Sequence, residues 1–445
     1  MDARSLVAVE LNDAGIALAL GGDGRADVIG TPSPGVAVLQ DARVLVGAEA
    51  ASRQRVTPLH AQNRFWQSLS VEQLPWRAAG IATVADLAHA HLTAVLAPAV
   101  RDGAVDALLA VPPGYSREQL GLLVGIANEC GVTVRGLVDL GLAACATVPP
   151  APHMLHLDLQ LHQATATLVE ASRAEGVQRR ARYELLPGVG VLAFHQALAE
   201  SVATSFVQET RFDPLHEATT EQRLHDRLGE WLAALGEQAE VPVEIEFGGM
   251  THRIELQRVR LIASIERLGA ELLRLVQGSR PAGTTLHVCV TPRVAALPGF
   301  LERLSALRDV LVVTLEPAAG ATGALRSASA IARAPEAISL VHRLPLQAPA
   351  EPFAAAALAS DAVPAEAVPT HVLFRGRAWP LTAVPLTLGW SVGAAPRALT
   401  LPAGTAGVSR AHCTLRVHDG QAVVEDQSTY GTFVNDERVG GRVAL

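Results

Sequence analysis

The first part of the chain alternates between short apolar runs and turn-forming residues. Residues 6–9 and 16–20 are apolar and flank an Asn-Asp-Ala-Gly segment, and residues 35–39 and 44–46 flank a second polar turn. Apolar runs of this length with turn residues in the gap are typical of β-hairpins. The pattern therefore predicts two hairpins at the start of the chain.

Longer segments with helical periodicity follow and alternate with apolar strands. Helices are predicted over 83–101, over 117–130 behind a capping Ser116, through 190–236, over 258–277, from 298 and from about 320. Strands are predicted at 107–111, 132–134, 154–169, 286–290 and 310–315, with a further hairpin over 241–256. Strands that alternate with helices indicate a layered α/β fold.

The composition changes near residue 335. From there to residue 369 the chain is dominated by Ala, Pro, Glu and Ser, which is typical of a linker, and from 371 onward short alternating strands and Gly or Pro turns resume. We therefore expect an α/β body over residues 1–334, a linker over 335–370 and a small all-β domain over 371–445.

Charge and cysteine content narrow the possible functions. The 445 residues carry a net charge of −8, and all 36 basic residues are arginine. The absence of lysine excludes lysine-based phosphate clamps and Schiff-base chemistry, and the acidic balance argues against nucleic acid as a partner. Four scattered cysteines without a CxxC pair indicate reduced thiols. With no long apolar run, we expect a cytoplasmic protein that does not bind membranes.

The order of segments in the body resembles the ATPase domain of the 70-kilodalton heat-shock (DnaK-type) chaperones. A strand ending in Val-Pro leads to a Gln-containing helix, an Asn-Glu-Cys-Gly-Val segment and an Ala-Ala pair. The matching segments are residues 111–119, 128–132, 143–144, 32–37, 46–50 and 318–330. The resemblance covers roughly residues 5–334, and it implies an actin-like (ribonuclease H-like) fold of two lobes.

The two turns that hold phosphates in this family have lost their glycines. In the family each turn follows an Asp, and its glycines let backbone N–H groups approach the phosphates. Here Glu10 precedes Leu-Asn-Asp-Ala at 11–14, and Asp158 precedes Leu-Gln-Leu-His-Gln at 159–163. Both turns thus lack the feature that phosphate binding needs.

Three more positions depart from the family in the same direction. The Glu of its connecting segment corresponds to Asp139, its adenosine-binding Gly-Gly-Ser turn corresponds to Val-Thr-Pro before Arg293, and its catalytic lysine region holds Arg64. The nucleotide-site remnants are thus Glu10, Asp139, Asp158 and Arg293. We expect a pseudo-ATPase without catalytic residues and without a cofactor, although weak binding of ATP with magnesium stays open.

A polar strand face around Asp158 admits a second interpretation. His156, Asp158, Gln160 and His162 alternate with leucines, so they share one face of a strand. Two histidines and an aspartate at this spacing are possible metal ligands. A half-exposed strand with a polar face is the favoured explanation, because lone histidine pairs without a cysteine cluster are weak evidence for a metal, and we therefore predict no metal site.

Three motifs near the C-terminus resemble a forkhead-associated (FHA) domain. They are Leu-Thr-Leu-Gly at 386–389, Val-Ser-Arg-Ala-His at 408–412 and Asp-Gln-Ser-Thr-Tyr-Gly-Thr-Phe-Val-Asn at 426–435. The resemblance implies a β-sandwich whose loops bind a Thr-phosphorylated protein partner. The phosphopeptide-binding candidates are Ser409, Arg410, Ser428, Thr429 and Tyr430. The structural candidates are Gly389, His412, Gly431 and Asn435.

Two departures bear on phosphate binding. The family's phosphate-gripping arginine is replaced by Trp390, and the asparagine before its loop glycine is replaced by Tyr430. Arg397 or Arg410 can supply the missing charge, and a phosphate-independent peptide-binding sandwich is the alternative. The family pattern also continues beyond the position of Leu445, so the sandwich is expected to lack its last strand.

Together these features predict a non-catalytic scaffold or regulator in which a pseudo-ATPase body is joined to a phosphothreonine-binding module. Two alternatives stay open at this level. One is an ATP-dependent, chaperone-like switch that presents the module, and the other is a structural assembly component that uses both domains as interaction surfaces.

Overall fold

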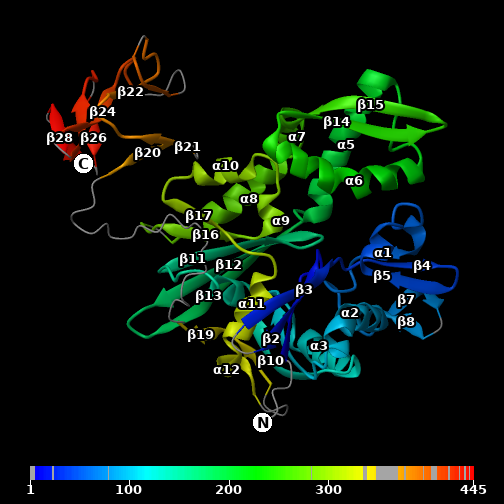
Figure 1. Cartoon of the computed structure of the whole chain (residues 1–445). Helices are drawn as coiled ribbons and strands as arrows, with labels where there is room; N and C mark the ends of the chain where they lie inside the picture. The colour runs from blue at the N-terminus through cyan, green and yellow to red at the C-terminus, as the bar shows by residue number, and fades with distance from the viewer. Residues whose placement is uncertain are drawn as a thin grey trace. The chain divides into compact units, whose positions relative to one another are not determined.

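The computed structural model describes residues 6–22, 25–78, 80–281, 283–333, 338–346, 369–374, 377–393, 395–401, 408–418, 421–429, 431–434, 437–439 and 441–444. The chain divides into two compact units near residue 350. The first unit is a mixed α/β body with two six-stranded sheets (Figure 1), and the second unit is all β.

The first sheet has the order β18-β10-β9-β1-β2-β3. Its strands are β1 (Leu6–Glu10), β2 (Ile16–Gly22), β3 (Arg25–Ser33), β9 (Asp106–Val111), β10 (Thr133–Asp139) and β18 (Leu340–Val341). The three N-terminal strands form an antiparallel meander, and β9, β10 and β18 then add in parallel. Helices α2 (Val84–Arg101) and α3 (Arg117–Glu129) pack against each other and supply part of the apolar core around this sheet.

The second sheet repeats this arrangement, in the order β17-β16-β11-β12-β13-β19. Its strands are β11 (His153–Leu159), β12 (Gln163–Ser172), β13 (Val177–Pro187), β16 (Leu286–Val290), β17 (Val310–Thr314) and β19 (Arg343–Pro345). Again an antiparallel meander comes first, and β16 and β17 add in parallel. Five strands therefore have the same order in both sheets, whereas the sixth lies at opposite edges: β18 is parallel to β10, and β19 is antiparallel to β13.

Two short helices, α4 (Leu140–Cys145) and α11 (Ala319–Arg326), pack together in a core that draws residues from both sheets. Glycine is required at their contact, because a Cβ on Gly323 would lie 1.8 Å from the carbonyl oxygen of Ala143. This close approach brings the ends of β1 and β11 toward each other.

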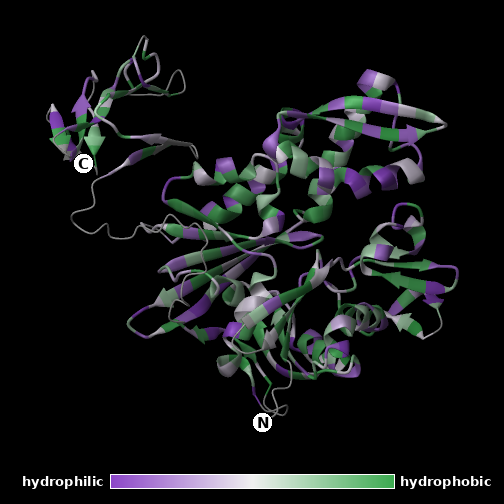
Figure 2. Ribbon diagram, viewed as in Figure 1, coloured by the Kyte–Doolittle hydropathy of each residue, from purple (hydrophilic) through white to green (hydrophobic). Residues whose placement is uncertain are grey.

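Further elements are inserted into each half. The first half contains β4 (Ala37–Gln40), β5 (Arg43–Val46), α1 (Gly47–Ala51), the 3₁₀ turn Pro58–His60, β6 (Ala61–Gln62), β7 (Gln73–Ala78) and β8 (Ile81–Thr83). The second half contains α5 (Val191–Thr210), α6 (Ala218–Glu237), β14 (Glu240–Phe247), β15 (Met250–Gln257), α7 (Arg258–Ser264), α8 (Glu266–Ser279), α9 (Pro292–Ala295), α10 (Phe300–Ser305) and α12 (Ala328–Ile331). Figure 2 shows the alternation of apolar and polar residues along the β14–β15 hairpin, whose apolar side chains are buried on one face.

Local signals in the sequence correspond to real helix starts. Ser116 forms a capping box with Gln119 at the start of α3, and Thr83 forms one with Asp86 at the start of α2. The predicted helix over 258–277 is instead two helices, because the backbone leaves the helical region at Ile265. The helix expected from residue 298 is α10, which begins at Phe300, whereas α9 and β13 were not expected.

The body extends further along the chain than the boundary expected at 334. Strand β18 pairs with β10, and β19 pairs with β13, so residues 340–345 belong to the body rather than to the linker that we predicted from residue 335. Leu344 is fully buried in the core between the sheets. The burial of this apolar side chain stabilises the segment in the body, although its Ala- and Pro-rich surroundings suggested a linker.

The second unit contains a five-stranded sheet in the order β23-β22-β24-β25-β28 and two two-stranded ladders. The strands are β20 (His371–Phe374), β21 (Arg377–Pro380), β22 (Leu386–Gly389), β23 (Ala398–Thr400), β24 (Cys413–His418), β25 (Gln421–Asp426), β26 (Phe433–Val434), β27 (Glu437–Arg438) and β28 (Arg442–Ala444). Strand β28 pairs with β25, and whether the domain lacks a further strand stays a prediction. Within the described residues, no helix is long and apolar enough to cross a bilayer.

Candidate functional sites

In the body, the turns of two hairpins from different sheets meet. The Asn12 side chain, in the β1–β2 turn, donates to Asp158 Oδ2 at 2.7 Å and to the Leu159 carbonyl at 3.1 Å. Asp13 accepts a hydrogen bond of 2.8 Å from the backbone N–H of Leu161 in the β11–β12 turn. All of these residues are buried. The two halves of the body are therefore joined by hydrogen bonds at the point where each first hairpin turns.

Arg293, in α9, lies between two buried carboxylates. Its guanidinium contacts Asp158 at 3.1 and 3.2 Å and Glu10 at 3.5 Å. Thr291 Oγ1 donates to Asp158 at 2.6 Å, and the backbone N–H of Gly320 donates to Glu10 at 2.8 Å. We call Glu10, Asn12, Asp13, Asp158 and Arg293 the ionic network. Three of the four predicted nucleotide-site remnants, Glu10, Asp158 and Arg293, thus lie in contact.

The pKa values of the carboxyl groups in this network are shifted in opposite directions. Burial raises the pKa of Glu10 and raises the pKa of Asp13 to about 6. Burial acts on Asp158 in the same direction, but the charges of Arg293 and His156 and the hydrogen bonds from Arg293 and Thr291 hold its pKa below the ordinary value. The favoured state is therefore an ionised Asp158 paired with Arg293.

Five backbone N–H groups of the two turns, those of Ala14, Gly15, Leu159, Gln160 and Leu161, donate hydrogen bonds within the protein. In the first turn, Ala14 donates to the Asn12 side chain and Gly15 to the Asn12 carbonyl. In the second turn, Leu159 donates to the carboxylate of Asp158, and Gln160 donates to the Gln163 carbonyl. Together with the Leu161–Asp13 bond, these contacts satisfy donors that would otherwise be available to an anion.

Asp139, the fourth predicted remnant, does not join this network. It is fully buried, caps α4 through the backbone N–H of Leu142, and pairs with Arg180 of β13 at 2.8 Å. Its partner comes from the second sheet, so this ion pair forms another link between the two halves.

Two further contacts cross between the halves. His162 Nε2 lies 3.0 Å from Asn63 Oδ1, whereas the neighbouring Arg64 is exposed and bonds Gln67. Arg64 therefore does not take the place of a catalytic lysine in the network.

The second contact links the turn after α1 to α6. Arg55 pairs with Glu221 at 3.0 Å, its backbone N–H donates to Gln222, and the Gln222 side chain donates to the Ala51 carbonyl. We call these contacts the α6 clasp.

The polar face of β11 is buried, which corrects the expectation of a half-exposed strand. His156 and Asp158 are 2% and 1% exposed. Helix α4 packs against β11, and Met154, which lies on the same face of the strand, belongs to the core that contains α4 and α11. Burial lowers the pKa of His156, and its Nε2 atom has no hydrogen-bond partner. Among the described residues, no group of three or more His, Cys, Asp or Glu side chains is arranged to hold a metal ion.

In the second unit, two loops meet beside the end of β22. Ser409 Oγ accepts a 3.0 Å hydrogen bond from the backbone N–H of Thr429, and its hydroxyl lies 3.4 Å from that of Thr429. Ser428 Oγ accepts a 2.7 Å bond from the backbone N–H of Gly431. The hydroxyls of Ser409 and Thr429 therefore lie side by side, with Thr429 exposed.

Two glycines allow the loops of this unit to pack closely against their neighbours. A Cβ on Gly389 would lie 2.0 Å from the carbonyl oxygen of Arg410, and Gly431 has φ of 101° with Arg438 packed against it. The backbone N–H of His412 donates to the Leu388 carbonyl. The side chain of His412 accepts, through Nδ1, a 3.2 Å hydrogen bond from the backbone N–H of Ser409. Tyr430 and Asn435 lie outside the described residues.

Residues 390–445 match the family model of the FHA domain. The chain carries an FHA domain. Its model begins one residue after Gly389, so the first of the three motifs lies just outside the match. Comparison with the curated proteins returns no match. FHA domains are protein-interaction modules that bind phosphothreonine peptides, and the body has no counterpart in this comparison.

Trp390 and Arg410 lie together at the edge of the FHA loops. The guanidinium carbon of Arg410 is 5.6 Å from the centre of the Trp390 ring, which is the range of a cation–π contact. Arg397 instead bonds Thr382 Oγ1 and the Val384 carbonyl. Of the two arginines considered as substitutes for the lost phosphate-binding residue, only Arg410 lies beside Ser409 in sequence and beside Trp390 in space.

Sequence reasoning missed the role of Asp426. Its Oδ1 atom accepts from the backbone N–H of Ser428 at 2.9 Å and from Thr432 Oγ1 at 2.7 Å. These hydrogen bonds lower the pKa of Asp426 and fix the loop that carries Thr429. The signal was present in the sequence, because Asp followed two residues later by Ser is typical of an Asx turn.

We predict that Arg293→Ala will lower the free energy of unfolding of the body by about 3–5 kcal/mol, because it leaves two buried carboxylates without a cation. Chemical denaturation measures this loss. Arg308→Ala, which removes a 94% exposed side chain, is the matched control and should change stability by less than about 0.5 kcal/mol. Combining Arg293→Ala with Glu10→Gln and Asp158→Asn should restore part of the loss. A loss below about 1 kcal/mol in the single variant contradicts the role given to Arg293.

The raised pKa of Asp13 predicts a pH dependence. Between its ordinary pKa of 3.8 and the folded value of about 6, the folded chain keeps a proton that the unfolded chain has released, so this group lowers stability as the pH rises. Asp13→Asn removes the effect. The stability of the variant relative to the parent should therefore increase between pH 4 and pH 7, by at most about 3 kcal/mol. A difference that is equal at both pH values would show that Asp13 titrates normally.

Proposed function

We propose that the chain is a non-catalytic scaffold or regulatory protein whose FHA domain docks on a Thr-phosphorylated protein partner, and whose body is a pseudo-ATPase of the actin-like, DnaK-type fold. The observation that carries the docking half of the proposal is the pair of neighbouring hydroxyls of Ser409 and Thr429, in the loop whose next residue, Arg410, has its guanidinium over the Trp390 ring.

The chemistry of these groups suits a phosphate ester. The two hydroxyls can each donate a hydrogen bond to phosphate oxygens, and an arginine adds a charge-assisted bond. Trp390 holds the Arg410 guanidinium by stacking, which reduces the freedom that Arg410 would lose on binding. We infer that Arg410 takes over the charge that the family's arginine supplies from the position of Trp390.

The body supports the pseudo-ATPase half of the proposal through its internal contacts. The residues do not fit a magnesium-bound nucleotide, because N–H donors of the second turn, those of Leu159 and Leu161, already bond protein carboxylates, and the Arg293 side chain lies between Glu10 and Asp158. The repeated order of five strands in the two sheets is the support for the actin-like assignment.

The phosphopeptide proposal is tested with a phosphothreonine peptide library and its unphosphorylated counterpart on the full chain. We expect binding that depends on phosphate, and a loss of at least about tenfold in affinity for Ser409→Ala and for Arg410→Ala, since a hydrogen bond to a charged group contributes about 1.5–3 kcal/mol. Arg416→Ala is the matched control, because Arg416 lies on β24 and pairs with Glu425. Equal binding of both libraries would favour the phosphate-independent sandwich.

Titration with ATP and magnesium tests the pseudo-ATPase. By calorimetry we expect no binding at micromolar nucleotide and no hydrolysis, because backbone donors of the second turn are occupied. Micromolar binding that Asp158→Ala abolishes would contradict the proposal and favour the nucleotide-dependent switch.

A further inference from the structure

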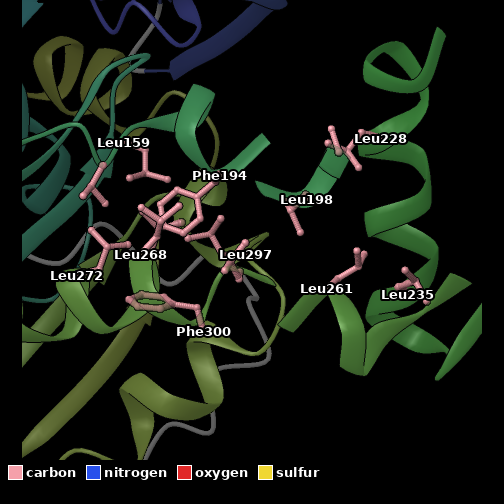
Figure 3. Packing of buried hydrophobic residues seen from close by; sticks show 14 of the residues in the cluster. Leu159, Phe194, Leu198, Leu228, Leu235, Leu261, Leu268, Leu272, Leu297 and Phe300 are labelled. Atoms are coloured by element: carbon pink, nitrogen blue, oxygen red, sulfur yellow. The ribbon is translucent and has the colours of Figure 1, made fainter. Parts of the chain in front are cut away.

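Strand β17 ends the second sheet of the body, and in the part of the chain that the structure describes no strand pairs with its outer edge. The strand reads Val-Leu-Val-Val-Thr and carries no charge, and Leu311 is 53% exposed. Val310 and Val312 pack against the buried apolar cluster that Figure 3 shows in part, so one face of the strand is anchored in the core. An uncharged edge strand of this kind is a template for pairing with another chain.

The other edges of the two six-stranded sheets have features that prevent such pairing. Strand β3 contains Arg25, Asp27 and Pro32. Its backbone also has a positive φ of 67° at Gly30. Strands β18 and β19 are only two and three residues long. Charges, proline, an irregular backbone and short length are the usual protection of an edge, and β17 has none of them beyond its modest length of five residues.

The hydrogen bonds to β16 determine which backbone groups of β17 face outward. The backbone N–H of Leu286 donates to the Asp309 carbonyl before the strand begins, and that of Leu315 donates to the Val290 carbonyl after it ends. The two strands are parallel, and in a parallel ladder alternate residues bond the neighbouring strand. The odd-numbered residues of this stretch therefore bond β16. The N–H and carbonyl groups that point to the open edge are those of the even-numbered residues Val310, Val312 and Thr314.

Two copies of this edge are complementary when they run antiparallel with Val312 on a two-fold axis. Val312 then faces its equivalent, and Val310 faces Thr314 of the second copy, so each outward N–H group meets a carbonyl group. Beyond the ladder, the same register brings Arg308, which is 94% exposed, toward the exposed Glu316 of the second copy. The two-fold symmetry forms this contact between opposite charges twice.

We propose that the β17 edge binds a second copy of this chain, so that two bodies pair through β17 in antiparallel orientation and their second sheets become continuous. The inference goes beyond the proposed function, because it requires neither a phosphate nor the FHA domain. The paired strands are short, so the interface is small and the dimer dissociates readily on dilution. On the proposed function, each dimer presents two FHA domains to phosphorylated partners.

Sedimentation velocity of the full chain over a concentration series measures the dimer, and we expect a dissociation constant below about 200 µM. Arg308→Glu and Glu316→Arg each replace two contacts between opposite charges by two between like charges, and each should weaken the dimer at least about tenfold. Mixed in equal amounts, the two variants should form a dimer as tight as that of the parent chain, because both contacts then join opposite charges again. Arg173→Glu, the same change at an exposed arginine after β12, is the matched control and should dimerise like the parent chain.

Val312→Pro tests the backbone pairing separately. It removes an outward N–H group without breaking a hydrogen bond to β16, so the body should stay folded while the dimer weakens at least about tenfold. Thermal denaturation checks the folding of every variant, and the two charge variants decide the matter if the proline variant fails to fold. A parent chain that is still monomeric at about 200 µM, a dimer equally tight in the charge variants, or charge variants that mixing does not rescue would each overturn the proposal. The affinity for a singly phosphorylated peptide, measured in parallel, should be the same in all variants.

Discussion

The architecture of the body depends on one partly buried cation that pairs with two buried carboxyl groups. Arg293 is the positive group that faces both Glu10 and Asp158, and these carboxylates come from β1 and β11, the first strand of each sheet. An ion buried alone would cost several kcal/mol, and the cost is offset only when paired charges and hydrogen bonds satisfy it. Gly320, Thr291 and Asn12 supply those hydrogen bonds. Separation of the two halves would therefore break these ion pairs and hydrogen bonds and expose the charged groups.

The same constraint explains why the contact between the halves is polar at its centre. Two β-hairpin turns bring backbone N–H and carbonyl groups into a buried position, and each such group needs a partner. Asp13 accepts from Leu161, and Asn12 donates to the Leu159 carbonyl, so side chains of one turn satisfy the backbone of the other. The Asp139–Arg180 pair and the α6 clasp add further contacts between the two halves. On the proposed function, a body held in one arrangement serves as a fixed interaction surface.

The local pattern of the sequence predicted the hairpins, the capped helices and the paired layers, because each follows from neighbours within a few positions. The resemblance to the chaperone ATPases then singled out Glu10, Asp158 and Arg293. What these residues do was beyond local reasoning, since Glu10 and Arg293 are 283 positions apart and touch only after both sheets form. For the same reason the strands at 340–345 were missed: their pairing partners lie in β10 and β13, and nothing adjacent in the sequence reveals them.

The two units differ in whether their candidate binding loops contain glycine. A loop that brings its backbone close to another group needs a residue without Cβ, and the FHA domain retains one at Gly389, where any side chain would strike the Arg410 carbonyl. The turns at residues 11–14 and 159–163 contain none, and their backbone donors bond the protein itself. Close approach to a ligand is therefore preserved in the loops around Ser409 and replaced by internal pairing around Arg293. On the proposed function, a phosphate is recognised in the FHA domain, and the carboxylates of the body have a structural role.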